Sequence, residues 1–187
     1  GSRSLEFTSE FADATFTGPT SYAEIIKYLK TAMSKYLPGL QYNTKYDVTA
    51  EDGGYSALSA TVKNIDPLLN AISEGLQIAP GTKLNFMMNP AQNHLTLRAA
   101  SDYVERGKML ATKLNINVTN QGDSLAMYMS SEDLYSGMLH LPQLSVMGGA
   151  KNNRVLLSAG FDDKTDSLSG VMALMAQLRR VEPTGMP

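Results

Sequence analysis

Cysteine is absent from the 187 residues of this chain, and histidine occurs only twice. Without cysteine there can be no disulfide framework, no catalytic thiol and no thiolate metal site. His94 and His140 stand apart, without the close spacing of ligating residues that a zinc site needs. The sequence therefore predicts neither a metal nor a cofactor.

Net charge and long apolar runs are also scarce. The chain has 16 basic and 18 acidic residues, a formal net charge of −2, which argues against nucleic acid or an anionic membrane as an electrostatic partner. No apolar run approaches the roughly 20 residues of a membrane-spanning helix, and no signal peptide opens the chain. Its start at Gly1-Ser2 and its abrupt stop at Met186-Pro187 indicate an excised fragment of a longer protein.

Catalytic motifs are missing as well. No nucleophile-elbow, phosphate-loop or dinucleotide-binding glycine pattern occurs. The run DDKTD at 162–166 lacks the alternation and closing glutamate of a calcium loop, so a turn is expected there. Gly53-Gly54 and Gly148-Gly149 are predicted to be hairpin tips. We therefore do not expect an enzyme.

What the chain does contain is a repeat. Residues 94–123 align with 124–153 when the sequence is shifted by thirty, so that Leu95 meets Leu125, and a third copy opens at Arg154. Self-similarity at a fixed period marks a unit that buries its apolar face by stacking on its neighbours. Each copy has the pattern strand, polar turn, strand, which predicts a continuing antiparallel sheet.

Apolar and polar residues alternate along these expected strands. A period of two places one set on each face of a strand, so one face should be apolar across many strands and the other wet. Turns are expected near 90–93, 120–123, 150–153 and 162–166. The residues predicted to line an apolar groove are Leu95, Leu97, Leu114, Ile116, Val118, Leu125, Met127, Met129, Leu144, Val146, Val155, Leu157 and Phe161.

The first part of the chain, 1–82, mixes strands with two expected helices, and 83–187 is the β-repeat segment continuous with it. Leu5–Phe16 has the pattern of one strand or two, and 41–50 and 55–63 have that of a hairpin. A short second helix is expected near 66–76, with Leu76 in its apolar stripe.

The first expected helix begins at a capping box, Ser21 to Glu24, and runs to Leu37. An isolated helix of this length is marginal without packing. The residues expected to pack it on the sheet are Ile25, Ile26, Leu29 and Met33. Lysines on or beside its wet side leave a position on a membrane surface as the alternative.

Methionine is unusually frequent, with eleven residues in the chain, and most of them fall on expected strands. Methionine packs adaptably against chains of varying shape. It either fills an ordinary core here or forms a surface that accommodates flexible apolar ligands, and the sequence favours neither.

Five stretches, taken in their order, resemble one family. They are KYLP at 35–38, NIDPLL at 64–69, LQIAPGT at 76–82, and the repeated units at 114–125 and 152–163. The chain resembles the TamB-type translocation and assembly module proteins, especially their Bacteroidetes-like branch, and through them the wider AsmA-like group.

This resemblance implies a periplasmic protein, anchored in the inner membrane in its full-length form, whose long sheet folds into a trough with an apolar inner face (a β-taco). It implies a phospholipid or other acyl-chain ligand and an outer-membrane barrel partner bound through a domain absent here. It implies no catalytic residue, and the net charge of −2 gives no reason to expect a nucleic-acid partner. The expected fold is thus mainly β with two helices (α+β), an extended antiparallel meander forming a trough-like sheet, as a fragment of a longer repeat protein.

Three functions stay open at this point. The first is a non-enzymatic module whose trough conducts phospholipids between the inner and outer membranes. The second is a scaffold for outer-membrane protein assembly that acts by strand addition at an open sheet edge. The third is a surface repeat protein such as an adhesin stalk, which predicts closed packing without an apolar groove.

Overall fold

The computed structural model describes residues 3–18, 36, 55–66, 69, 75–89, 92–162 and 169–177. Within these ranges the chain is built from strands. They are β1 (Arg3–Thr8), β2 (Ala12–Gly18), β3 (Ser56–Val62), β4 (Leu76–Ile78), β5 (Lys83–Asn89), β6 (His94–Arg106), β7 (Met109–Gln121), β8 (Ser124–Ser136), β9 (Leu139–Lys151), β10 (Arg154–Asp162) and β11 (Ser169–Gln177).

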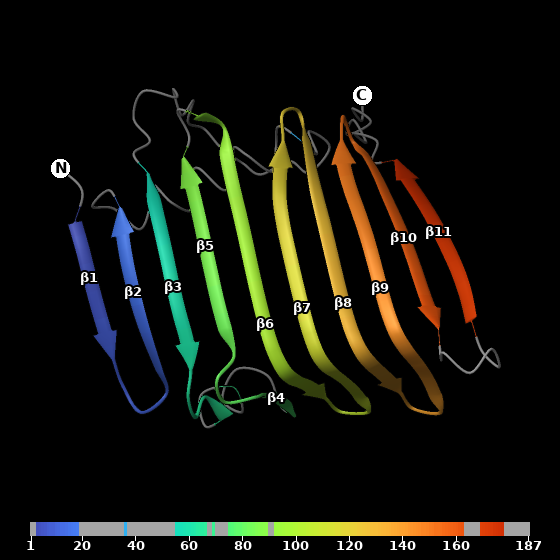
Figure 1. Cartoon of the computed structure of the whole chain (residues 1–187), viewed down its shortest axis with the longest axis horizontal. Coiled ribbons are helices and arrows are strands. Elements are labelled where there is room, and N and C mark those ends of the chain that lie inside the picture. The colour runs from blue at the N-terminus through green and yellow to red at the C-terminus, as the bar shows by residue number, and fades with distance from the viewer. Residues whose placement is uncertain are drawn as a thin grey trace, which may run out of the picture.

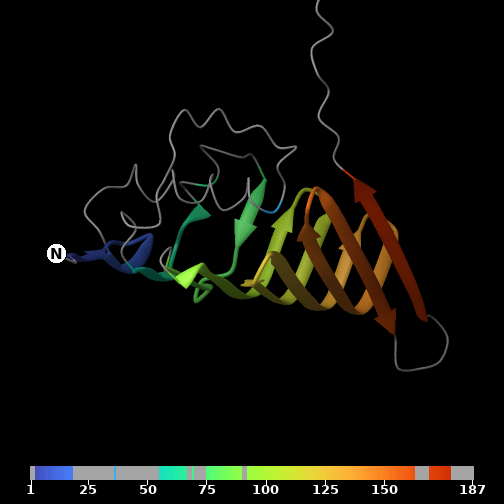
Figure 2. The ribbon, with the colours of Figure 1, turned by 90° about the horizontal axis from the view of Figure 1, so that it is seen from above.

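All of these strands belong to one 11-stranded sheet in which every pairing is antiparallel. The path runs in chain order from β1 to β11, with β4 left off it (Figure 1). β4 pairs instead with the last residues of β6, beyond the point where β5 pairs with the same strand. Seen from above, the sheet is open and curled (Figure 2).

The long hairpins from β6 to β10 are joined by two-residue turns. In three of these turns the first residue is a glycine at positive φ, and the second residue has a negative φ. The glycines are Gly107, Gly122 and Gly137. That pattern fits a type II′ turn, which requires glycine at its first central position. The fourth turn, Asn152-Asn153, has φ of 48° and 62°, as a type I′ turn requires. Both types match the twist of the flanking strands and fix the register.

β7 and β9 each contain one residue with a left-handed backbone. Lys113 has φ 47° and Gln143 has φ 48°, and the pairing skips both. Beside them a serine on the neighbouring strand bonds locally: Ser101 Oγ donates to the Tyr103 carbonyl and Ser131 Oγ to the Asp133 carbonyl, both at 2.7 Å. These interruptions lie near the ends at which β6 to β9 curve away from the viewer in Figure 1.

The expectation of a mainly antiparallel sheet is confirmed, and so are the turns at 120–123 and 150–153. Leu5–Phe16 forms two strands, β1 and β2, in place of one. Of the turn expected at 162–166, only Asp162 is described, as the last residue of β10.

Two expectations are wrong. Gly148-Gly149 is not a hairpin tip but lies inside β9, because the two-residue turn falls at Asn152-Asn153. Leu76 does not extend the second helix. It begins β4, because the left-handed Gly75, at φ 73°, turns the chain there and β4 hydrogen-bonds to β6.

Much of the expected helical structure lies outside the described residues. Tyr36 in the first expected helix, and Asp66 and Leu69 in the second, are helical. The packing residues Ile25, Ile26, Leu29 and Met33 lie outside the described residues, as do the strand expected at 41–50 and the tip expected at Gly53-Gly54.

The left-handed position in β9 predicts a backbone-specific effect of substitution. Replacing Gln143 by valine should lower the free energy of unfolding by about 1–2 kcal/mol, because a β-branched residue at φ 48° meets its own backbone. Urea unfolding monitored by circular dichroism measures this loss. Asn117→Val, at an exposed β7 position without a positive φ, should stay within about 0.5 kcal/mol of the parent. Equal losses of unfolding free energy in the two variants would contradict the left-handed backbone at Gln143.

Candidate functional site

One face of the sheet carries an apolar row that runs from edge to edge. Directly opposite residues in an antiparallel ladder point to the same face, so the register traces the row strand by strand. Only its β9 member, a glycine, has no side chain. From β1 to β11 the first apolar row comprises Leu5, Phe16, Leu58, Phe86, Leu97, Val118, Met127, Gly148, Leu157 and Leu174.

A second apolar row runs parallel to the first. It is displaced by two residues along each strand, about 6.7 Å, and contains no polar side chain. From β1 to β11 it comprises Phe7, Ala14, Ala60, Leu84, Ala99, Ile116, Met129, Val146, Ala159 and Met172. The two rows together form what we call the apolar face.

The glycine in the first row is filled by its neighbours. A Cβ built at Gly148 would lie 2.9 Å from Leu157 Cδ2, closer than real Cβ atoms approach, and 3.1 Å from Met127 Cε, a tight contact. Phe161 covers Gly170 in the same way, with its Cζ 2.7 Å from the position of a Cβ. The side chains on either side of these glycines thus keep the apolar surface continuous.

Flanking rows widen this face toward both ends of the strands. Leu125, Ala150 and Val155 form one of them. There Asn120 replaces an apolar residue, and its Oδ1 accepts from the Leu95 N–H at 2.7 Å. The other flanking row has Leu114 opposite Ser101, with Leu144 opposite Ser131. Every residue predicted to line the groove falls on this face, from Leu95 in β6 to Phe161 in β10.

Sequence reasoning missed the part of the apolar face that lies before residue 94. β1, β2, β3 and β5 contribute Leu5, Phe16, Leu58 and Phe86 to the first row. The alternation in these strands was visible in the sequence. No shift by thirty links them to the later strands, so the sequence did not show that they continue the same face.

The ring of Tyr36 covers part of the apolar face. Tyr36 is only 2% exposed and packs against Ala150, with Leu125 and Val155 beside it. Its carbonyl accepts from the Asn153 N–H at 3.2 Å, so the contact is also tied to the β9–β10 turn. The ring of Tyr36 therefore lies on a flanking row of the apolar face.

The opposite face is polar across the first part of the sheet. One of its rows begins Glu6, Thr15, Ser59, Asn85, Arg98 and Asn117. Farther along the sheet this polar face acquires apolar residues, and Met147 in β9 is 59% exposed. In β11 both faces carry exposed apolar side chains, since Val171, Met172, Leu174 and Met175 are all exposed.

Titratable groups on the described residues form pairs and no larger site. Lys113 Nζ lies 2.7 Å from Asp102 Oδ1, and this hydrogen bond, with the nearby negative charge, raises the pKa of the Lys113 ammonium. His140 Nε2 lies 2.7 Å from Asp133 Oδ1, and its ring stacks on Tyr135. Across the described ranges, no three histidine or acidic residues gather where they could hold a metal ion.

Nor does any helix in those ranges have the length and apolar character to span a membrane.

Comparisons with protein-family models, curated proteins and solved structures find no match to this chain. The resemblance to the TamB-type proteins therefore rests on the sequence stretches alone.

The Tyr36 contact predicts coupled effects on stability and surface exposure. Tyr36→Ala should lower the free energy of unfolding by about 3–5 kcal/mol, because it removes a large, fully packed ring. It should also increase binding of the fluorescent dye ANS, since Leu125 and Val155 lose their cover.

The matched control is Tyr128→Ala on the polar face, where the ring is 46% exposed. Its unfolding free energy and ANS binding should change little. Equal losses for the two tyrosines would show that Tyr36 does not cover the apolar face.

Proposed function

We propose that this chain is a non-enzymatic module whose apolar face forms the floor of a trough that conducts phospholipids, or other acyl-chain ligands, between two membranes. The observation that carries the proposal is the pair of apolar rows that cross the sheet from β1 to β11. The rows cross every strand of the main path without a polar side chain, so the face offers a continuous apolar surface from one edge strand to the other.

Simple energetics support an acyl chain as the occupant. Strands lie about 4.8 Å apart, so the rows extend for about 43 Å across ten strands. An acyl chain lying along them would gain about 0.8 kcal/mol for each buried CH₂ group. Because leucine, methionine, valine and alanine supply no directional contacts, the chain could slide from strand to strand without losing specific bonds.

The wider setting of this proposal comes from the resemblance to the TamB-type and AsmA-like proteins. It comprises a place in the periplasm, an inner-membrane anchor elsewhere in the full-length protein, an outer-membrane barrel partner and a role in outer-membrane biogenesis. The thirty-residue repeat supports it, since a sheet that grows by adding similar hairpins can extend a trough to any required length.

The proposal predicts that acyl chains contact one face only. A photo-crosslinking amino acid at Met129, on the apolar face, should capture phospholipid acyl chains in vivo, whereas the same group at Met147 on the other face should not. The pair is matched in residue type, and Met147 is the exposed one at 59%, so accessibility alone favours the opposite result. Mass spectrometry of the captured adducts gives the readout. Equal labelling at both positions, or none at 129, would rule out the trough.

A second candidate function is a scaffold for outer-membrane protein assembly by strand addition. It is favoured by β11, which among the described strands pairs with β10 alone and has no charged residue between Ser169 and Gln177. An edge strand normally carries charges or proline that prevent pairing with another chain. β11 carries neither, so its free backbone groups can accept a client strand.

The two candidates predict different effects of charges on the edge strand. In the scaffold case, Val171→Lys with Met175→Lys should abolish crosslinking of client strands to β11, because lysine on an edge opposes pairing. If the protein acts by conducting acyl chains along the apolar face, labelling at position 129 should persist in this double variant. Loss of client crosslinking without loss of function would rule out the scaffold function. Unchanged client crosslinking would show that clients do not pair with β11.

A further inference from the structure

The polar face contains a hollow over β5 to β8, on the side of the sheet opposite the proposed trough. Its volume is about 330 Å³, and it is lined from two adjacent rows of the ladder. One row brings together Asn85, Arg98, Asn117 and Tyr128, and the other Lys83, Ala100 and Asn115. The small side chain of Ala100 forms the low point among longer ones.

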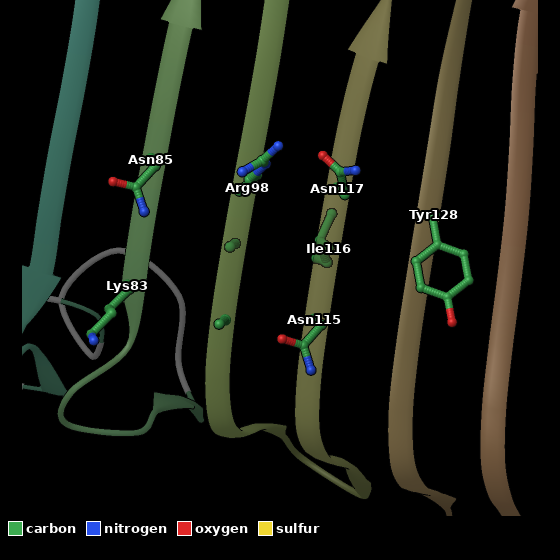
Figure 3. A pocket seen from close by; sticks show the side chains of 9 residues that line it. Lys83, Asn85, Arg98, Asn115, Ile116, Asn117 and Tyr128 are labelled. Carbon is green, nitrogen blue, oxygen red and sulfur yellow. The ribbon is translucent and has the colours of Figure 1, made fainter.

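The labelled side chains in Figure 3 show how this hollow is arranged. Lys83 and Asn85 stand on β5, Arg98 on β6, Asn115 and Asn117 on β7, and Tyr128 on β8. Ile116 belongs to the apolar face and contributes to the lining only from behind. Three strand spacings separate β5 from β8, so the polar groups span about 14 Å.

The hollow is positively charged although the chain as a whole is negative. Two of its lining residues are cations, Lys83 and Arg98, and none is acidic, whereas the formal net charge of the chain is −2. Neither cation has an ion pair or hydrogen bond within the described part of the structure. Asp102, farther along β6 on the same face, is engaged by Lys113 at 2.7 Å. Both cations are therefore available to an anion from outside.

The remaining groups add two further recognition elements. The amides of Asn85, Asn115 and Asn117 offer donors and acceptors in one patch, as a ring bearing several hydroxyl groups requires. Among these three amides, Asn115 alone bonds to another described residue, from its Nδ2 to the Lys113 carbonyl at 3.1 Å. Tyr128 presents an exposed aromatic ring, whose electron-rich face attracts the C–H groups of a sugar ring.

We propose that this hollow binds an acidic sugar unit. The carboxylate or phosphate of this unit lies between Lys83 and Arg98, hydroxyl groups bond to the asparagine amides, and the ring of the adjoining sugar packs on Tyr128, two strands beyond Arg98. The guanidinium of Arg98 can hold a carboxylate through two parallel hydrogen bonds. Neither simple phosphate nor a neutral sugar uses all three elements. Two cations are too few for the phosphate backbone of nucleic acid.

The proposal is independent of the trough, because it concerns the other face. The acidic sugar can be the headgroup of a glycolipid or part of a free polysaccharide, and the chemistry of recognition is the same for both. Binding is measured by calorimetry at low salt with four probes: a free glucuronate-containing oligosaccharide, its neutral glucose counterpart, inorganic phosphate, and vesicles that contain a diacylglycerol bearing a glucuronate-containing disaccharide.

The free acidic oligosaccharide should bind at least about tenfold more tightly than the neutral one, which lacks the acid group, or phosphate, which lacks both the sugar hydroxyl groups and the ring. Arg98→Gln and Tyr128→Ala should each weaken binding about tenfold or more, and Arg98→Lys should retain part of it. Lys151→Gln, an exposed site in β9 outside the lining of this hollow, removes the same charge and should leave binding unchanged.

Binding to the vesicles alone, still sensitive to Arg98 and Tyr128, would assign the sugar to a lipid headgroup and support the proposal. Equal affinity for phosphate and the acidic oligosaccharide, or insensitivity to Tyr128→Ala, would reduce the hollow to a cationic patch and overturn it. Absence of binding to every probe would overturn it as well. Met129→Asp, on the apolar face, should impair acyl-chain binding and leave sugar binding intact, which separates this test from that of the trough.

Discussion

The register of the antiparallel ladder is the constraint on which the rest of this structure depends. Since side chains alternate between faces, a slip of one residue between any two strands would move an entire apolar set to the polar face. The two-residue turns at Gly107, Gly122, Gly137 and Asn152-Asn153 permit one register each. The apolar rows are therefore a consequence of turn chemistry as much as of hydrophobic burial.

The interruptions at Lys113 and Gln143 lie near the ends where the strands curve, and they do not disturb this register. A β-bulge would insert an extra residue and exchange the faces beyond it. Here the pairing resumes on both sides with the same partners in step, so that Ser101 faces Leu114 and Tyr103 faces Thr112. The left-handed residue with a serine bonded beside it thus preserves the apolar rows on both sides of the interruption. Lys113 and Gln143 lie thirty residues apart, at equivalent phases of the sequence repeat.

The sequence predicted what alternation and turn residues determine, and it failed where the outcome depends on distant partners. The period of two from Leu95 to Phe161 sufficed to place the candidate groove residues on one face. The sequence predicted a helix at Leu76 because its spacing from the preceding apolar residues fits one. Pairing of β4 with the distant strand β6 makes Leu76 a strand residue instead. The hollow around Ala100 was not foreseen, since it requires four strands in register and no local pattern marks it.

The position of Tyr36 bears on how a covered sheet could still conduct an acyl chain. Its ring packs on the flanking row at Leu125, Ala150 and Val155, near the turn whose Asn153 N–H bonds to its carbonyl. The next row, through Met127, lies about 6.7 Å farther along the strands, and the second apolar row a further 6.7 Å. A group seated on the flanking row therefore closes one rim of the apolar face, and the proposed path runs along the central rows. A covered flanking row is compatible with the proposed path along the central rows. Each row crosses all the strands, so one row can be covered along its length while its neighbours stay open.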